Sequence, residues 1–190
     1  MKRKCKYVWV WLCLVAISAC SKLENELTTG SKITLTSQEE VNNFKADGDI
    51  LQLTISGESI TDLSTLNVQK VKNLIIENTG IEQLRIPTLN AITVMMHIKG
   101  NQRLLSLDGL DNLRFINGSL IIEDNDALED ISGILGLKVF TGSLTITGND
   151  RLGKNEVCLT DQLGFCVIKH LVESGIFSGT LTLASNHPEA

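Results

Sequence analysis

The sequence predicts a β-rich solenoid, in which the short strands of successive coils lie side by side and short helices close both ends. Two stretches of the chain superimpose without a gap when one is shifted by 24 residues. The matching positions are Leu107, Gly109, Leu113, Ile116, Gly118, Leu120, Ile122, Asn125 and Leu128, which recur as Ile131, Gly133, Leu137, Phe140, Gly142, Leu144, Ile146, Asn149 and Leu152. A period of this length is typical of repeat proteins, whose units bury their apolar sides only against neighbouring units.

Each predicted coil contains a strand with two aliphatic residues that face the core. These pairs are Leu53 and Ile55, Leu74 and Ile76, Met96 and Ile98, Leu120 and Ile122, Leu144 and Ile146, and Leu181 and Leu183. Alternate residues of a strand point to opposite sides, so the residue between each pair is expected to face outward. A column of asparagines follows the strands and is expected to bond the turn backbone: Asn78, Asn101, Asn125, Asn149 and Asn186.

The remainder of each repeat predicts further turns and a second short β segment. Leu107 with Leu110, and Ile131 with Ile134, favour this segment on another side of the coil. Four glycines keep their place in the period and predict tight corners: Gly109, Gly118, Gly133 and Gly142.

Short helices are predicted at both ends of the solenoid. Ser37 followed by Glu40 fits a capping box, which predicts a helix from about Gln38 to Lys45. Near the other end, Thr160 begins an amphipathic pattern that stops at Gly175. This second helix is expected to cover the last coil, because a terminal repeat otherwise exposes its apolar side. Docking of a partner helix on its apolar stripe is the alternative.

Residues 1–19 have the pattern of an export signal. A basic leader is followed by an apolar run from Tyr7 to Ile17, which is too short for a membrane-spanning helix of roughly 20 residues. The ending Ile17–Cys20 resembles a bacterial lipobox, and that resemblance implies cleavage before Cys20 and attachment of lipid to it. Residues 20–31 then form the lipidated cysteine and a flexible tether. An ordinary secretory peptide is the alternative.

The expected location is the bacterial cell envelope, with the protein held to the membrane by the lipid on Cys20. Lys22, Glu24 and Glu26 resemble signals that direct some lipoproteins of Gram-negative bacteria to the outer face of the outer membrane. A plain polar linker explains these residues equally well. The sequence therefore favours the outer membrane and leaves the leaflet open.

The charge of the exported chain limits its partners. Of 17 basic residues, four lie in the leader, which leaves 13 basic against 22 acidic residues. Such a surface is expected to repel nucleic acid and anionic lipid, because phosphate groups are bound by basic surfaces. Both tryptophans and the only tyrosine are also in the leader, so few aromatic surfaces remain for stacking on bases or sugars.

The repeated phrase carries a family resemblance. It reads LLSLDGLDNLRFINGSLIIEDN and then LEDISGILGLKVFTGSLTITGN, and it resembles the receptor L domain, a relative of the leucine-rich repeats. The opening ITLTSQEEVNNFKADGDILQLTISG and the closing FCVIKHLVESGIFSGTLTLASN resemble single-domain bacterial lipoproteins of that superfamily. The resemblance implies that residues 32–190 form a right-handed, leucine-rich-repeat-like coil with helical caps and a role in surface recognition.

The outward face of the strands is the candidate binding surface. Its proposed residues are Thr54, Ile75, Met95, His97, Ile121 and Thr145. Apolar residues on a polar face often mark contact sites, but isoleucine is also a common strand residue. A second column of Glu77, Lys99 and Glu123 is self-complementary and is explained as well by support of the sheet.

Two functions follow from this face. The first is a lipid-anchored recognition module that binds a protein or glycan partner. The second is a structural or accessory subunit of an envelope complex without a ligand of its own. Catalysis is not predicted, because His97, His170 and His187 are scattered and no catalytic motif or phosphate loop is present. No cofactor is predicted, and the acidic turn around Asn125 lacks the later residues of a calcium loop.

Two cysteines remain beyond Cys20, namely Cys158 and Cys166. An even pair in an exported chain favours a disulfide. Cys166 also falls on the apolar side of the predicted helix, so a buried thiol is the alternative. Sequence separation alone does not show whether the two β-carbons approach closely enough to form the bond.

Overall fold

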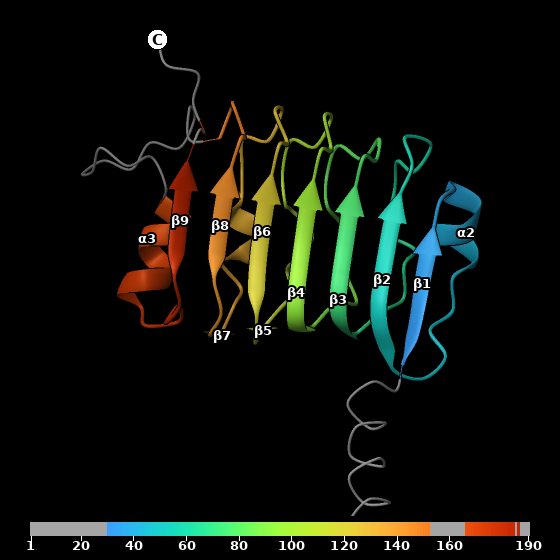
Figure 1. The fold of residues 1–190 in the computed structure, drawn as a ribbon, viewed down its shortest axis with the longest axis horizontal. Helices are drawn as coiled ribbons and strands as arrows, with labels where there is room; N and C mark the ends of the chain where they lie inside the picture. The colour runs from blue at the N-terminus through green and yellow to red at the C-terminus, as the bar shows by residue number, and fades with distance from the viewer. Residues whose placement is uncertain (1–29, 153–165, 185, 187–190) are drawn as a thin grey trace, which may run out of the picture. The chain divides into compact units, whose positions relative to one another are not determined.

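The computed structural model describes residues 30–152, 166–184 and 186. They form a strand-rich parallel β-solenoid, which confirms the prediction of a β-rich solenoid (Figure 1). The nine strands of the described residues are β1 (Ser31–Leu35), β2 (Ile50–Ser56), β3 (Lys70–Glu77), β4 (Ala91–Lys99), β5 (Phe115–Ile116), β6 (Ser119–Glu123), β7 (Val139–Phe140), β8 (Leu144–Thr147) and β9 (Leu181–Ala184). The predicted signal peptide, Cys20 and Cys158 lie outside the described residues.

Seven strands form the main ladder, in the order β1, β2, β3, β4, β6, β8 and β9. The register places Leu120 opposite both Met96 and Leu144, as the repeat predicts. The inward pairs of β2, β3, β4, β6 and β8 are fully buried and form one continuous core. β1 adds a rung that the repeat pattern misses, since Ile33 pairs with Leu53.

The prediction of a buried inward pair at Leu181 and Leu183 is wrong for Leu181. The register opposite Leu144 is as expected, but Leu181 is 38% exposed. Among the described residues, β9 pairs along only one edge, with β8. A residue that faces the core in an inner coil therefore has packing on one side only at this end of the ladder.

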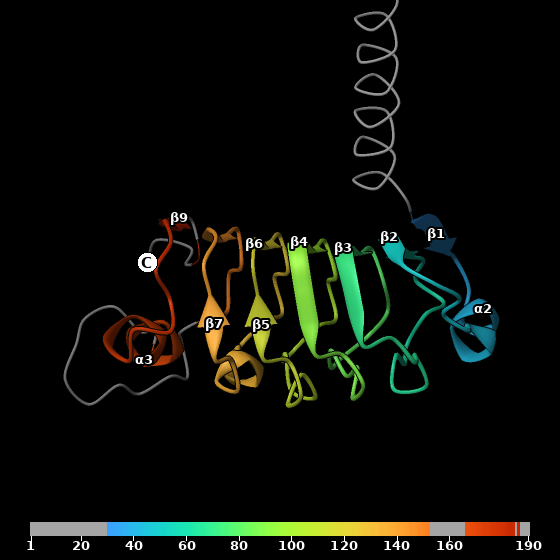
Figure 2. The same cartoon turned by 90° about the horizontal axis from the view of Figure 1, so that it is seen from below.

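A second short ladder lies on the underside of the coils. Ala91 of β4 pairs with Phe115 of β5, and Phe115 pairs with Val139 of β7. Figure 2 shows β5 and β7 from this side, together with the first parts of β3 and β4. We call this surface the underside.

The second β segment is therefore not where the repeat predicts it. Around Leu107 the backbone forms only isolated bridges, such as Ser106 with Asp130, and the 3-10 helix η1 covers Ser132–Ile134. The fully buried leucines of this part are spaced by three residues: Leu104, Leu107, Leu110 and Leu113. A spacing of three follows successive turns and does not match the two-residue alternation of a strand.

Close packing between coils explains two of the glycines that recur at a fixed place in the repeat. A β-carbon on Gly118 would lie 1.9 Å from the Val94 carbonyl oxygen, and one on Gly142 would lie 1.9 Å from the Gly118 carbonyl oxygen. The φ angles of Gly118 and Gly142 are not in the left-handed region. These glycines are required because the backbone of the preceding coil passes directly over them, and the predicted tight corner is not the reason.

Two helices lie at opposite ends of the ladder (Figures 1 and 2). Helix α2 (Gln38–Asn43) begins as predicted, with the Ser37 side chain accepting from the backbone N–H of Glu40. Its Val41 is fully buried, and the Gln38 amide bonds the backbone of the following coil at Thr61 and Asp62. Helix α3 (Cys166–Glu173) buries three aliphatic residues in the core: Val167, Ile168 and Leu171.

Cys166 is a disulfide cysteine. All other cysteines of the chain lie outside the described residues, so pairing with Cys158 stays a prediction. Over the described ranges, no helix has both the length and the apolar character that a membrane crossing requires.

Candidate functional site

The residues predicted to form a binding face lie together on the outer side of the main ladder. In the register, Thr54 is opposite Ile75, Ile75 is opposite His97, His97 is opposite Ile121, and Ile121 is opposite Thr145. Met95 lies in the adjacent row, between Asn73 and Ser119. The predicted alignment in a single row is confirmed, and we call the surface of Thr54, Ile75, Met95, His97, Ile121 and Thr145 the ladder face.

The centre of the ladder face is apolar. Ile75 and Ile121 flank His97 on the neighbouring strands, and adjacent strands are about 4.8 Å apart. Ile75, Met95 and Ile121 are half-buried, since each packs sideways on its neighbours and still reaches solvent. Thr54 and Thr145 border this centre with hydroxyl groups. The face therefore combines a small apolar surface with a polar margin.

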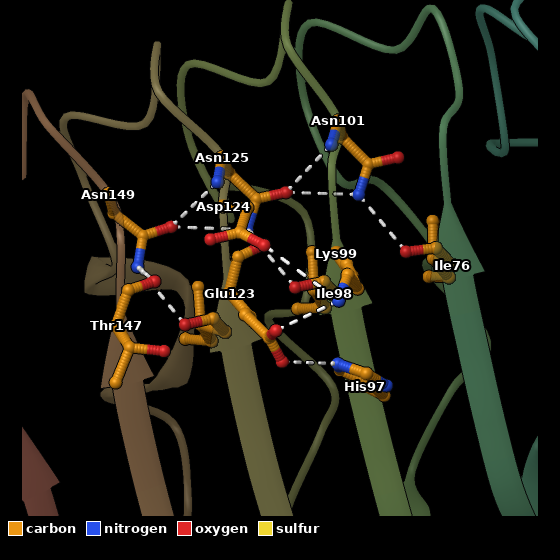
Figure 3. A network of polar contacts seen from close by, with 11 residues as sticks. Ile76, His97, Ile98, Lys99, Asn101, Glu123, Asp124, Asn125, Thr147 and Asn149 are labelled. Carbon is orange, nitrogen blue, oxygen red and sulfur yellow. Dashed lines mark hydrogen bonds and ion pairs between the residues drawn. The ribbon is translucent and has the colours of Figure 1, made fainter.

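A charged cluster lies beside the ladder face, at the strand ends (Figure 3). The Glu123 carboxylate accepts from Lys99 Nζ at 2.9 Å and lies 3.3 Å from His97 Nε2. Lys99 also lies 3.8 Å from Asp124. The predicted column of Glu77, Lys99 and Glu123 therefore forms an ion pair on one side only. Among the described residues, Glu77 forms no ion pair and acts on Lys99 at longer range.

The same contacts shift the pKa values of the two partners. The hydrogen bond from Lys99 lowers the pKa of the Glu123 carboxyl group, burial opposes this effect, and the contact with His97 lowers the pKa further. The hydrogen bond with Glu123, followed by attraction to the same carboxylate, raises the pKa of Lys99. The cluster is thus held as a carboxylate and an ammonium ion at neutral pH.

Replacing Glu123 with glutamine is expected to remove a small, pH-dependent part of the stability. Because folding lowers the pKa of Glu123, its contribution is complete above the ordinary value of 4.5 and is lost as the pH falls through the lowered value. The difference in unfolding free energy between wild type and Glu123→Gln should stay below about 1 kcal/mol and should disappear in acid. Urea denaturation at several pH values measures it. Glu58→Gln is the control, and a difference independent of pH would contradict the assignment.

An asparagine ladder fixes the turns behind the charged cluster. Asn125 Nδ2 donates to the Ile98 carbonyl oxygen at 3.0 Å, and Asn125 Oδ1 accepts from the Asn101 backbone N–H at 3.0 Å. Asn149 repeats these bonds one coil further, to Ile122 and to the Asn125 backbone (Figure 3). All three asparagines are fully buried. The predicted role of this column in bonding the turn backbone is confirmed, so these side chains hold the coils together.

The inclusion of Asn78 in this column is wrong. Asn78 comes two residues after Ile76, whereas Asn101 comes three residues after Ile98. The ladder position is occupied by Thr79, whose backbone N–H and hydroxyl group donate to Asn101 Oδ1 at 3.0 and 2.6 Å. Asn78 is exposed with a φ of 52°, and it occupies the corner that later coils fill with residues of similar φ. Asparagine tolerates this left-handed conformation better than most residues do.

A hollow on the turns that follow the strands was not predicted. It has a volume of about 570 Å³ and is lined by residues from three successive coils: Thr61, Asp62, Ser64, Gly80, Glu82, Gln83, Arg85, Arg103 and Leu105. Glu82 and Arg103 form an ion pair across it, and Asp62 bonds Ser64. These residues differ from coil to coil, so the repeat pattern contains no signal that brings them together. Acidic and basic groups are balanced here, and the hollow is open to solvent.

The acidic turn around Asn125 places Asp124 and Asp126 on the surface. Asp124 has a φ of 55° and lies near Lys99. Within residues 30–152, 166–184 and 186, no three His, Cys, Asp or Glu side chains are grouped so that they could hold a metal ion.

No family model, no curated protein and no solved structure matches this chain. The geometry of the described residues is therefore the basis of the function considered next.

Proposed function

We propose that this protein is a lipid-anchored recognition module of the bacterial envelope, and that the ladder face binds a partner. One observation supports this function most directly. The register brings Ile75, His97 and Ile121 into one row beside Met95, which makes an apolar centre on a surface built by parallel strands. Small apolar areas with a polar margin are common at protein contacts. A protein partner is favoured over a glycan, because none of the described phenylalanines lies on this face.

The finer fold assignment is part of the same proposal. We assign the coil to the right-handed, leucine-rich-repeat-like type of the receptor L domain, with α2 and α3 as its caps. The buried asparagine ladder and the parallel register support this assignment. Burial of Val41 by α2, and of Val167 and Leu171 by α3, supports the capping role, since both helices cover core residues next to a terminal strand.

The anchor and the location come from the sequence. The pattern ahead of Cys20 supports lipid attachment to that residue, and the envelope, with the outer membrane favoured, is the corresponding location. A binding role without catalysis fits a ladder face that is composed of aliphatic and threonine side chains around one histidine.

The alternative function, a structural subunit, has one observation in its favour. Glu123 is satisfied within the chain by Lys99 and His97, so the charged part of the outer surface needs no partner. If the apolar centre also serves only the sheet, the protein is a spacer in a larger assembly. The two functions differ in whether Ile75 and Ile121 are needed for an interaction.

The double substitution Ile75→Ser and Ile121→Ser is expected to reduce capture of an envelope partner by at least about tenfold. Both side chains are half-buried at the surface, so the unfolding free energy should fall by no more than about 1 kcal/mol per site. Capture from envelope extract by the immobilised chain, followed by a glycan array, measures binding and separates the two partner classes.

The matched control is the double substitution Leu135→Ser and Val172→Ser. These aliphatic residues are 42% and 48% exposed and lie away from the ladder face. The control should bind like wild type. Equal capture by all three proteins would favour the structural subunit, and loss of the fold in the Ile75 and Ile121 variant would assign those residues to the sheet.

A further inference from the structure

The charges of the solenoid are unevenly distributed along the direction of its strands. Because all ladder strands are parallel, their first residues share one edge and their last residues share the opposite edge. Basic residues outnumber acidic ones at the first edge and on the underside, where Lys70, Lys72, Arg114 and Lys138 lie with Asp49 and Asp111. Acidic residues outnumber basic ones at the last edge and in the turns after it, where Glu58, Glu77, Glu123, Asp124, Asp126 and Asp150 lie with Lys99, Arg103 and Arg151.

The basic residues of the underside are not neutralised by carboxylates. Among the described residues, none of the four forms an ion pair. The Arg114 guanidinium donates to the backbone carbonyls of Asp111, Leu113 and Gly136, which fixes its position and leaves its charge in place. Lys70 and Lys138 are exposed. The overall acidic composition therefore conceals a basic surface.

Apolar side chains lie among these basic groups. Lys70, Ala91, Phe115 and Val139 occupy successive positions of one row across the underside. Phe115 is 39% exposed, and Val94 of β4 is 49% exposed. Amphipathic helices that lie at a lipid interface combine basic side chains with exposed aromatic and aliphatic ones in a similar way. Figure 2 shows this side of the coils.

The chain enters the solenoid at the same edge. β1 begins at Ser31, so its first residue lies at the edge where β3 and β4 begin with Lys70 and Ala91. A lipid on Cys20 is joined to this edge by about ten residues of tether. The described chain therefore begins at the edge that carries Lys70, and the acidic turns follow the opposite edge.

We propose that the underside docks against an anionic lipid surface. The proposal rests on the lipid anchor of the proposed function, which brings the domain to the membrane. Each lysine or arginine near an anionic bilayer strengthens attachment several-fold, and Phe115 adds an apolar contact at the interface. In this orientation the acidic turns point away from the lipid, which avoids the repulsion that the net charge predicts. The ladder face stays free for its partner.

Lysine labelling of the full chain on vesicles tests the orientation. The protein is mixed with vesicles of phosphatidylcholine alone and with vesicles that also contain phosphatidylglycerol. Acylation of each lysine by an amine-reactive reagent is then followed by mass spectrometry. Labelling of Lys70 and Lys138 should fall several-fold on the anionic vesicles, and high salt should restore it. Labelling of Lys99, at the acidic end, should not change.

Two matched variants separate position from net charge. Lys70→Glu with Lys138→Glu reverses two charges on the underside, and Arg103→Glu with Arg151→Glu reverses two exposed charges in turns beyond the strand ends. Protection of Lys72 on anionic vesicles should be lost in the first variant and retained in the second. An equal loss of Lys72 protection in both variants would show that only the net charge matters, and this would overturn the proposal.

Lipid attachment to Cys20 is measured separately, from the mass of the peptide that contains this residue. An acylated Cys20 with no protection of Lys70 and Lys138 would overturn the docking surface and leave the anchor standing. An unmodified Cys20 with full, salt-sensitive protection would contradict the anchor and support the docking surface. An unmodified Cys20 together with no protection of Lys70 and Lys138 would overturn both the lipid anchor and the docking surface.

Discussion

Replacing Asn125 with leucine is expected to lower the unfolding free energy by about 4 kcal/mol. The asparagine side chain is fully buried and joins three coils. Leucine has a similar size but no polar atoms, so the Ile98 carbonyl group and the Asn101 backbone N–H would each lose a partner in a fully buried site. Each unsatisfied buried group costs about 1 to 3 kcal/mol. Urea denaturation followed by circular dichroism measures the change.

Asn67→Leu is the matched control for Asn125→Leu. Asn67 is exposed, and its side chain makes no hydrogen bond with another described residue. The same chemical change there should alter stability by no more than about 0.5 kcal/mol. If the two variants lose similar stability, the asparagine ladder is not a major source of cohesion between the coils.

Replacing Gly118 with alanine is expected to destabilise the fold by about 3 kcal/mol or more. The added β-carbon would lie 1.9 Å from the Val94 carbonyl oxygen and 2.5 Å from its carbonyl carbon. These are backbone atoms of the preceding coil, so relief requires two coils to separate. Because the same contact recurs between Gly142 and the Gly118 carbonyl oxygen, the distortion should pass to the next coil. The shift in thermal midpoint measures the effect.

Gly48→Ala separates this clash from an ordinary glycine effect. Gly48 has a φ of +73°, and no atom lies within 4 Å of the position of its β-carbon. Only the left-handed backbone is then unfavourable, at about 1 kcal/mol. A loss in Gly118→Ala no larger than in Gly48→Ala would show that the coils can move apart easily.

The architecture was predictable because equivalent residues of successive repeats make equivalent contacts. Leu120 and Leu144 occupy the same place in the period, so stacked coils bring them side by side, and the register confirms this. The alignment of Ile75, His97 and Ile121 in one row was predictable for the same reason, since each of them lies between two inward residues of its strand. The alignment of a candidate face is thus contained in a single sequence, although its binding role is not.

Errors arose where a coil departs from the common pattern. In the coil of β3 the ladder position carries Thr79, three residues after Ile76 as in the other coils, and an asparagine stands one residue earlier, so Asn78 was assigned to the position that Thr79 holds. Leu181 matches the inward pattern, yet it lies at the end of the ladder and is exposed. A pattern records which residues are equivalent, but it contains no information on where the stacking ends.

Charge relationships were the least predictable part of the site. Lys99 has a glutamate on each side in the register, and the ion pair forms with Glu123. His97 and Asp124 lie around the same groups, and the register alone does not record these contacts. The hollow lined by Arg85 and Arg103 was missed for a related reason, because it is built from the variable residues of three coils.

By itself the sequence determined the solenoid, its rows of aligned side chains and the buried column of asparagines, because these depend only on the period and on the alternation of side chains along a strand. Tertiary structure alone decided three things: the replacement of Asn78 by Thr79, the partner of Lys99, and the basic underside of an acidic protein. Each depends on how turns and edges of separate coils meet in space. Spatial separation of charge in particular leaves no trace in composition, since the net charge is the same however the residues are arranged.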